Sequence, residues 1–246
     1  MTEIIGRSSS NRFPTQSVMN GAGIVLLVDK PMDWTSFDVV AKIRSLFNLD
    51  RIGHAGTLDP RATGLLIVCT GKKTKAVSGF AELEKEYEGV MTLGKTTPSF
   101  DSETEVLEVR DIGEIHSSDV ARVLTEFKGK QLQTPPMYSA VKRKGKPLYK
   151  YARKGRIVER EPKEIEIKEI LLLDFQPPDV RFRVVCSKGT YIRSLVHDVG
   201  ARLGCGAMLS ELRRTRIGPY DVHDALTIGE LAEFRNRLRL AVIPFS

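Results

Sequence analysis

Residues 53–64 read GHAGTLDPRATG and run directly into the apolar sequence LLIVC at residues 65–69. Glycine and proline recur through the first part, which predicts a tight loop that feeds a buried strand. Pro60 fixes its own φ and restricts Asp59 to extended geometry. Such a loop can hold an isolated carboxylate in place, and Asp59 is the candidate, with His54 upstream in the same loop. The residues alone leave a second interpretation open, in which Asp59 only caps an Asx turn.

The overall composition is typical of a globular protein. The 246 residues can form one large domain or two small ones. A hydrophobic content of 41%, a charged content of 28% and a net charge of +7 favour a polyanionic partner such as nucleic acid. Because no long apolar run and no basic-then-apolar leader occur, we expect a cytoplasmic protein with no membrane association.

The cysteines and histidines argue against a metal site. Cys69, Cys186 and Cys205 are far apart in the sequence and form no Cys-x-x-Cys pair, which predicts reduced core thiols. None of the four histidines is spaced to share a metal ion with His54.

Hydrophobic periodicity predicts a mixture of strands and helices. Because the two types do not alternate strictly, an α+β fold is favoured over a doubly wound parallel one. Residues 1–21 are polar and predict a flexible tail. The expected strands cover residues 23–30, 65–69, 86–93, 163–175 and 180–187. The expected helices cover residues 37–47 with Ser36 as N-cap, 73–83, 117–127 with Ser117 or Ser118 as N-cap, 189–204, and 228–238 with Thr227 as N-cap.

One segment, residues 133–160, combines positive charge with aromatic side chains. Only Glu159 is acidic between residues 142 and 160. Basic side chains with interleaved tyrosines suit an RNA backbone with exposed bases. A solvated basic face on a surface helix is the alternative. The candidate contacts to the RNA backbone are Lys142, Arg143, Lys144, Lys150, Arg153 and Lys154.

Several motifs resemble those of the TruB-type tRNA pseudouridine synthases, and they occur in the family's order over residues 25–218. The loop that carries Asp59 is similar to the family's catalytic loop. The other stretches are Asp29-Lys30-Pro31 with Thr35-Ser36, Lys85-Glu86-Tyr87 with Leu93-Gly94 and Asp101, PMYSAVK at 136–142 through LYKYAR at 148–153, CSKGTYIR at 186–193, LGCGA at 203–207, and Leu212-Arg213-Arg214.

This resemblance implies the pseudouridine synthase fold, a mixed and mostly antiparallel sheet flanked by helices. A catalytic domain would cover residues 22–246, with an RNA-gripping insertion at about residues 130–160 and no C-terminal RNA-binding (PUA) domain. The implied reaction isomerises uridine to pseudouridine at position 55 in the T-loop of tRNA, without a cofactor or a metal. The partner would be the T-arm stem-loop, with no protein partner required and the enzyme a monomer.

The chemistry of this isomerisation makes four demands on the protein. An ionised carboxylate acts at the sugar, and another group takes the proton from C5 of uracil. A closed pocket keeps water from the intermediate, and the base must leave its stack to expose its reacting atoms.

The resemblance implies a role for each of six residues. Asp59 would be the catalytic carboxylate, either attacking C1′ or removing a sugar proton. Arg193 would pair with Asp59 and keep it ionised, although an ordinary surface arginine fits the sequence as well. Tyr87 would stack on the target base, and it is also explained as a core tyrosine on a strand. Tyr191 and Leu212 would line the base pocket, or simply pack in the core, and His54 would help to order the T-loop.

Two alternatives belong to other functional classes. A tRNA-binding or tRNA-folding factor would keep the basic segment without needing catalysis, although Asp59, Tyr87 and Arg193 are all present. A hydrolase using His54, Asp59 and a serine is disfavoured, because no Gly-x-Ser-x-Gly motif occurs. One departure from the family pattern is Ala55, in a position where a threonine is usual.

Overall fold

The computed structural model describes residues 4–7, 13–143 and 145–240. Its contacts divide the chain into two compact units. The first unit comprises Met1–Lys85 and Arg213–Ser246, and the second comprises Glu86–Leu212. No helix among the described residues has the length and apolar character to cross a membrane.

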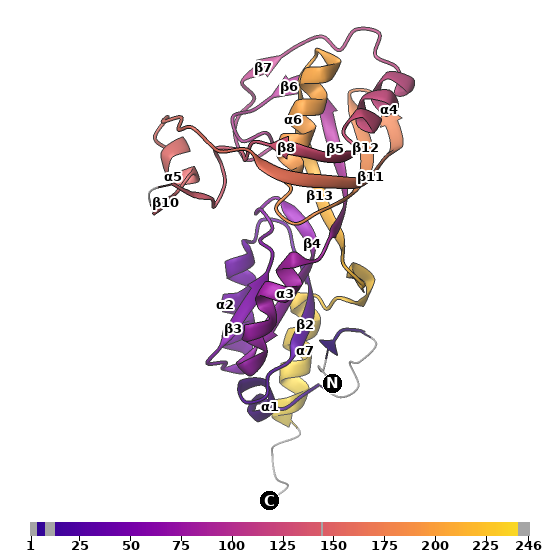
Figure 1. Ribbon diagram of the computed structural model, residues 1–246. Helices are drawn as coiled ribbons and strands as arrows, with labels where there is room; N and C mark the ends of the chain where they lie inside the picture. Colours follow the sequence, from indigo (N-terminus) through magenta and orange to yellow (C-terminus); the bar gives the residue numbers. More distant parts are fainter. Residues whose placement is uncertain (1–3, 8–12, 144, 241–246) are drawn as a thin grey trace, which may run out of the picture. The chain divides into compact units, whose positions relative to one another are not determined.

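The first unit is built on a mostly antiparallel set of strands (Figure 1). β2 (Val25–Lys30) pairs antiparallel with β4 (Ala62–Thr70), and β3 (Ile52–Ala55) also pairs antiparallel with β4. β1 (Ile4–Ile5) lies parallel to β2. On the far side of β4, the order continues to β13 (Ala207–Ile217), whose end pairs with β14 (Tyr220–Asp221). A mixed, mostly antiparallel sheet was predicted, and it is confirmed.

Both faces of β2 and β4 are covered. Leu26, Val28, Leu66 and Val68 pack in one cluster with side chains of α1 (Gln16–Asn20), α2 (Ser36–Phe47) and α7 (Ile228–Leu240). The alternate residues of the two strands, Val25, Leu27, Leu65 and Ile67, belong to a second cluster, against which α3 (Val77–Glu82) packs. Because both faces are buried, these strands read in the sequence as continuous apolar runs.

The predicted flexible tail, residues 1–21, needs correction in its described parts, residues 4–7 and 13–21. Ile4–Ile5 forms β1, and residues 16–20 form α1, with Thr15 as its N-cap. Ile5 and Met19 are fully buried in the first core cluster. The polar composition concealed Ile5 and Met19, whose burial offsets the entropy lost on ordering β1 and α1.

Several helix boundaries differ from the predicted ones. α2 is capped by Thr35 instead of Ser36, because Thr35 and Asp38 form a reciprocal capping box. α4 (Ser117–Glu126) is capped by His116. The predicted helix at 73–83 is a 3₁₀ turn, η2 (Gly71–Ala76), followed by α3. The predicted N-cap Thr227 is confirmed, since its hydroxyl accepts a hydrogen bond from Glu230 N at 3.2 Å.

The second unit continues from β13 through β5 (Lys85–Leu93), β12 (Asp179–Cys186) and β11 (Lys163–Gln176) to β8 (Gly129–Gln133). The β11–β12 and β11–β8 pairs are antiparallel. The predicted alternation along β12 is confirmed, with its even-numbered residues from Val180 to Cys186 buried. α4 contacts both β11 and α6 (Ile192–Leu203).

The basic segment is a small lobe between β8 and β11. It contains the short strands β9 (Lys142–Arg143) and β10 (Lys146–Pro147), followed by α5 (Tyr149–Ala152). Because residues 129–133 pair with β11 in the sheet, the lobe begins after Gln133, later than the predicted boundary near residue 130. We call residues 134–162 the basic lobe.

A close contact within the second unit leads to a first prediction. Gly200 lies in α6, and a Cβ there would come within 2.1 Å of the backbone nitrogen of Ala207. We expect Gly200→Ala to destabilise the protein by about 3 kcal/mol, because the obstacle is backbone. Gly79→Ala in α3 is the matched control, since a Cβ there meets nothing within 4 Å. That variant should gain about 0.5–1 kcal/mol. Urea unfolding measures the unfolding free energy of both variants. Equal changes in the two variants would contradict the close approach of Gly200 to Ala207.

Candidate active site

The loop that carries Asp59 connects two paired strands. β3 and β4 flank residues 56–61, and Ala62 N donates to Asp59 O at 3.1 Å to close a turn. His54 therefore lies on β3, not in the loop itself as the sequence suggested. Asp59 is half-buried.

Both neighbours of Asp59 are anchored to the segment that begins α2. Leu58 N donates to Ser36 Oγ at 2.9 Å, and the same hydroxyl donates to Leu58 O at 3.3 Å. On the other side, Pro60 O accepts from Asp33 N at 2.9 Å. Because the chain is held immediately before and after Asp59, its carboxylate is carried on a preorganised backbone.

Lys30 places a buried positive charge beside this loop. Its ammonium donates to Pro31 O at 2.8 Å, Trp34 O at 2.6 Å and Pro60 O at 3.3 Å. Burial lowers the pKa of Lys30 to about 8, although the Asp59 carboxylate opposes this shift. At pH 7 the ammonium is charged, and its field favours an ionised Asp59.

Lys30→Met tests this arrangement. We expect a loss of about 3 kcal/mol in unfolding free energy at pH 7, because three buried carbonyl oxygens lose their donor. The pKa of Lys30 is about 8 in the folded protein and 10.5 without the fold. Between these values the unfolded chain binds more protons, so the wild-type protein gains stability relative to the variant as pH rises. Each pKa unit contributes at most about 1.4 kcal/mol. Urea unfolding from pH 7 to 10 measures the difference in unfolding free energy between the wild type and Lys30→Met. A difference that stays constant over this range would contradict the prediction.

Two arginines of β13 complete the first unit's site. Arg214 is 1% exposed, and it donates through Nε to Leu65 O at 2.7 Å and through a terminal nitrogen to Gly56 O at 3.0 Å. Arg213 forms a bidentate pair with Asp29 at 2.7 and 3.1 Å. Arg214 thus ties the start of the Asp59 loop to the strand that follows it. The sequence analysis quoted both arginines in a motif and assigned them no role.

His54 lies close enough to Arg214 to respond to its charge. Burial lowers the pKa of His54 first, and the Arg214 guanidinium lowers it further. The imidazole is therefore neutral at pH 7 and can act as both donor and acceptor.

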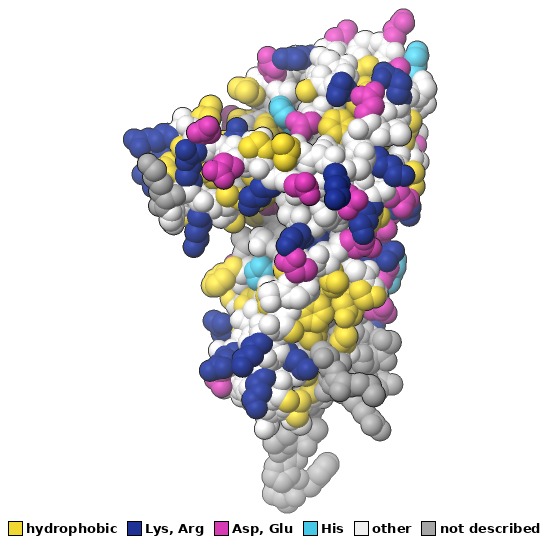
Figure 2. All heavy atoms as spheres, in the orientation of Figure 1, with side chains coloured by type: hydrophobic (Ala, Val, Ile, Leu, Met, Phe, Trp, Pro, Cys, Tyr) yellow, Lys and Arg dark blue, Asp and Glu magenta, His cyan; other side chains and the backbone are white. Residues whose placement is uncertain are grey.

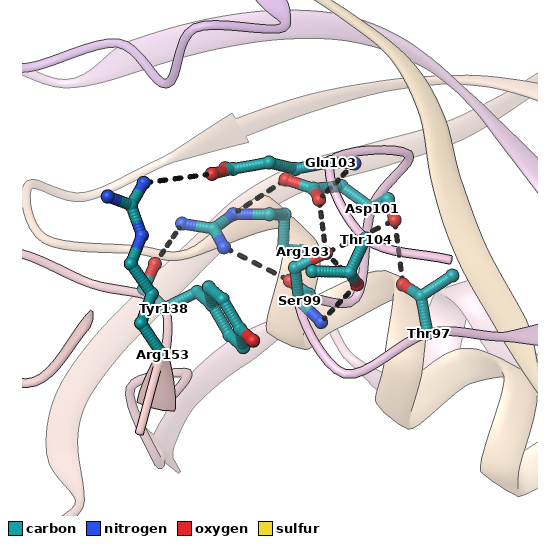
Figure 3. Close-up of polar contacts among 8 residues, drawn as sticks. All are labelled: Thr97, Ser99, Asp101, Glu103, Thr104, Tyr138, Arg153 and Arg193. Atoms are coloured by element: carbon teal, nitrogen blue, oxygen red, sulfur yellow. Dashed lines mark hydrogen bonds and ion pairs between the residues drawn. The ribbon is translucent and has the colours of Figure 1, made fainter. Parts of the chain in front are cut away.

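Arg193 is the centre of a buried polar network in the second unit (Figure 3). Its side chain is 3% exposed, so the surface-arginine interpretation is wrong. One terminal nitrogen donates to Ser99 O at 3.0 Å, and the other donates to Tyr138 O at 2.9 Å. Nε lies 3.5 Å from a carboxylate oxygen of Asp101.

Asp101 is equally buried and is held by the loop around it. Its carboxylate accepts from Ser99 Oγ at 2.5 Å and from Glu103 N at 2.9 Å. Figure 3 shows the Asp101 carboxylate and Ser99 O on one side of the Arg193 guanidinium, with Tyr138 O on the other. Asp101 belongs to a motif shared with the family, but the sequence does not predict its contact with Arg193. The available signal was the arginine in the first turn of a helix, where the macrodipole disfavours a cation and a carboxylate partner is needed.

The other pocket candidates also belong to the second unit. Tyr87 is 8% exposed on β5, as the alternation predicted. Tyr191 immediately precedes α6, and its backbone exchanges two hydrogen bonds with the Gln133 side chain, at 2.8 and 3.0 Å. Leu212 is half-buried in the middle of β13. The structure thus groups His54 with Asp59 in one unit, and Tyr87, Tyr191, Arg193 and Leu212 in the other.

The basic lobe presents most of its predicted RNA contacts to solvent. Lys142, Lys150 and Lys154 are exposed, and Figure 2 shows dark blue side chains gathered on this lobe. Arg143 lies 3.5 Å from Glu159, and Arg153 lies 3.8 Å from Glu103. Such exposed ion pairs contribute little stability, so phosphates can replace the carboxylates. Lys144 lies outside the described residues.

The cysteines and the possible metal-ligating side chains were also located. Cys69, Cys186 and Cys205 are buried free thiols, as predicted. Across residues 4–7, 13–143 and 145–240, no three His, Cys, Asp or Glu side chains are grouped so that they could hold a metal ion.

Comparison with known proteins identifies relatives along nearly the whole chain. The family description "TruB family pseudouridylate synthase (N terminal domain)" matches residues 44–192, and "tRNA pseudouridylate synthase B C-terminal domain" matches residues 193–244. A protein named tRNA pseudouridine synthase B from Chloroherpeton thalassium is 47% identical over 86% of this chain and 90% of its own length. Its namesake from Opitutus terrae is 51% identical over 83% and 85%.

Solved structures share the fold. A "Cbf5-Nop10-Gar1 Complex" contains a chain that is 33% identical, with a TM-score of 0.73 over 95% of this chain. An "H/ACA RNP bound to a substrate RNA containing 2'-deoxyuridine" contains one that is 30% identical, with a TM-score of 0.71 over 95%. The present chain spans only 60% and 59% of the length of these two chains.

Proposed function

The chain belongs to the TruB family of pseudouridylate synthases, and we propose that it converts uridine to pseudouridine at position 55 in the T-loop of tRNA. Family membership makes it an isomerase that acts on uridine. The tRNA substrate is carried over from relatives that bear the name tRNA pseudouridine synthase B. The alternative of a hydrolase does not fit this membership.

The observation that carries the proposal is the doubly anchored loop around Asp59. Ser36 holds Leu58, Asp33 N and Lys30 hold Pro60, and the Asp59 carboxylate between them interacts electrostatically with the buried Lys30 ammonium. This is the environment that keeps a carboxylate ionised and in place at neutral pH.

The reaction would use this carboxylate at the sugar of the flipped-out nucleotide. Asp59 acts either as a nucleophile on C1′ or as the base that removes a sugar proton, while the N1–C1′ bond breaks. The uracil then turns, C5 bonds to C1′, and the C5 proton leaves as N1 gains one, so the product has the composition of the substrate. The Lys30 charge supports the ionised state of Asp59 before the reaction begins.

The second unit would supply the surroundings of the base. We assign Tyr87 to stacking on the target uracil, Tyr191 and Leu212 to the pocket wall, and Arg193 to partnership with Asp59. His54 of the first unit would help to order the T-loop, and its neutral imidazole suits hydrogen bonding to a nucleotide. These assignments rest on the family resemblance of the motifs, together with the burial of Tyr87 and Arg193.

The basic lobe would bind the T-arm through its phosphates. Lys142, Lys150 and Lys154 are exposed, and Arg143 and Arg153 have only weak surface ion pairs to exchange for phosphate contacts. Binding through phosphates gives recognition by shape and a steep dependence on salt. Lys144 is included in this set on its position in the sequence alone.

Tritium release tests the function directly. A T-arm stem-loop RNA labelled with tritium at C5 of uracil should release its label only when pseudouridine forms. A matched RNA with cytidine at position 55, labelled in its other pyrimidines, should release none. Release from the first RNA alone supports the proposal. Binding of both RNAs without release would overturn it in favour of an RNA-binding factor.

The same proposal describes a cytoplasmic enzyme that acts as a monomer without a protein partner. Light scattering on the active protein should give a mass near 27.5 kDa. A dimer mass that persists at the assay concentration would contradict the monomer.

A further inference from the structure

A strained residue lies at the centre of the loop that holds Arg193. Phe100 has a φ of +66°, a conformation that is a true outlier for a bulky side chain. Such conformations persist only where the surrounding structure enforces them, and they cluster at functional sites. Contacts around Phe100 must therefore hold its backbone in this conformation.

The Phe100 ring is held flat against His197. The two ring centroids are 4.0 Å apart, and the ring planes differ by 16°. Burial lowers the pKa of His197, while the Asp198 carboxylate opposes this shift. The Phe100 ring can stack closely on the imidazole of His197 when that imidazole is neutral. A second anchor is the hydrogen bond from Leu209 N to Phe100 O, at 2.9 Å.

The geometry links this stack to the polar network. Ser99 and Asp101, which flank Phe100, both contact Arg193, one through its backbone carbonyl and the other through its carboxylate. His197 lies one helical turn after Arg193 on α6, so both belong to neighbouring positions on one helix face. The positive φ at residue 100 turns the chain so that both flanking residues face the guanidinium.

We propose that the stack of Phe100 on His197 is a positioning device, which holds Ser99 and Asp101 against Arg193 for the isomerisation of uridine. The proposal rests on the function proposed above. Phe100 and His197 act only through Arg193 and its partners, so neither is a catalytic residue. Without the ring, the backbone at residue 100 is released from its strained conformation, and one of the two flanking contacts is lost.

Four variants separate the ring from the backbone. Phe100→Gly removes the ring but tolerates a positive φ, and His197→Ala removes the other half of the stack. Phe100→Tyr and His197→Phe are the matched controls, because each keeps an aromatic ring in place. Single-turnover tritium release and the dissociation constant for the T-arm RNA are measured for all four.

We expect Phe100→Gly and His197→Ala to slow the single-turnover rate by about 10- to 100-fold, as small misplacements of reacting groups do. RNA binding should stay within about twofold, because the basic lobe is untouched. The two controls should keep a rate within about threefold of the wild type. This separation of rate from binding, with rescue by the aromatic variants, is not expected of a general loss of stability.

A second measurement is independent of activity. The Arg193 Nε–H signal in the NMR spectrum, identified by its absence from Arg193→Lys, should exchange with solvent at least about 10-fold faster in Phe100→Gly than in Phe100→Tyr. A wild-type rate or unchanged exchange in Phe100→Gly overturns the positioning role. If the wild-type protein forms no pseudouridine, the proposed function fails, and the exchange rates still decide whether the stack positions Arg193.

Discussion

Replacing Asp59 with asparagine is expected to reduce pseudouridine formation by at least about 1,000-fold. The amide is nearly isosteric with the carboxylate, but it can neither attack C1′ nor accept a sugar proton. The loop should keep its shape, because it is anchored through Ser36 on one side of Asp59 and through Pro60 O on the other. Binding of the T-arm RNA should therefore stay within about twofold, since the proposed phosphate contacts lie in the basic lobe. Tritium release under single-turnover conditions and a filter-binding titration measure the two effects.

A matched control lies in the same part of the first unit. Asp33 has a φ of +63° and pairs with Arg61 at 3.0 Å on the surface. Asn tolerates this backbone conformation, so Asp33→Asn loses an exposed ion pair that contributes about 0–1 kcal/mol and an electrostatic interaction with Lys30 that is smaller than that of Asp59. It should keep nearly full activity. If Asp59→Asn is as active as Asp33→Asn, Asp59 is not the catalytic carboxylate.

The parts of the fold that the sequence predicted well are those in which burial follows a local pattern. The alternation from Val180 to Cys186 identified both the strand and its buried face, and the same reasoning placed Tyr87 inward. The apolar run after Gly64 became β4 because both of its faces are covered. In each case the pattern of neighbours in sequence is the pattern of burial.

Other features depend on partners that are distant in sequence. Ser36 was predicted to cap α2, but its hydroxyl instead binds Leu58, 22 residues away, and Thr35 takes the cap. β13 escaped prediction because its sequence, AMLSELRRTRI, mixes charged and apolar residues without clean alternation. Its buried Arg214 is stable there only because carbonyl oxygens of Gly56 and Leu65 accept its hydrogen bonds. Local patterns carry no information about such partners.

The candidate site shows the same division. The loop around Asp59 could be found from its turn residues, and the basic lobe from its charge. The network of Arg193 could not be found this way, because Ser99, Asp101 and Tyr138 come from segments that periodicity leaves as loops. The sequence left a surface position for Arg193 open as an alternative, and its burial excludes that alternative.

That buried network supports the second large prediction. Arg193→Met should destabilise the protein by about 3–5 kcal/mol, because it leaves the buried Asp101 carboxylate without its cation. Asp101→Asn should cost a similar amount, since it leaves a buried guanidinium beside a neutral amide. Urea unfolding measures both variants, and single-turnover tritium release should fall by at least about 100-fold for Arg193→Met.

The double variant Arg193→Met/Asp101→Asn distinguishes charge balance from a direct role in the reaction. Removing both charges leaves neither one buried alone, so its unfolding free energy should exceed the value expected from adding the two single losses. Activity should not follow stability, because the proposed partner of Asp59 is still missing. A double variant that regains both stability and rate would mean that Arg193 serves only to neutralise Asp101. Recovery of stability without recovery of rate would show that the reaction needs the Arg193 guanidinium for more than neutralising Asp101, since methionine also provides no donor for Ser99 O and Tyr138 O.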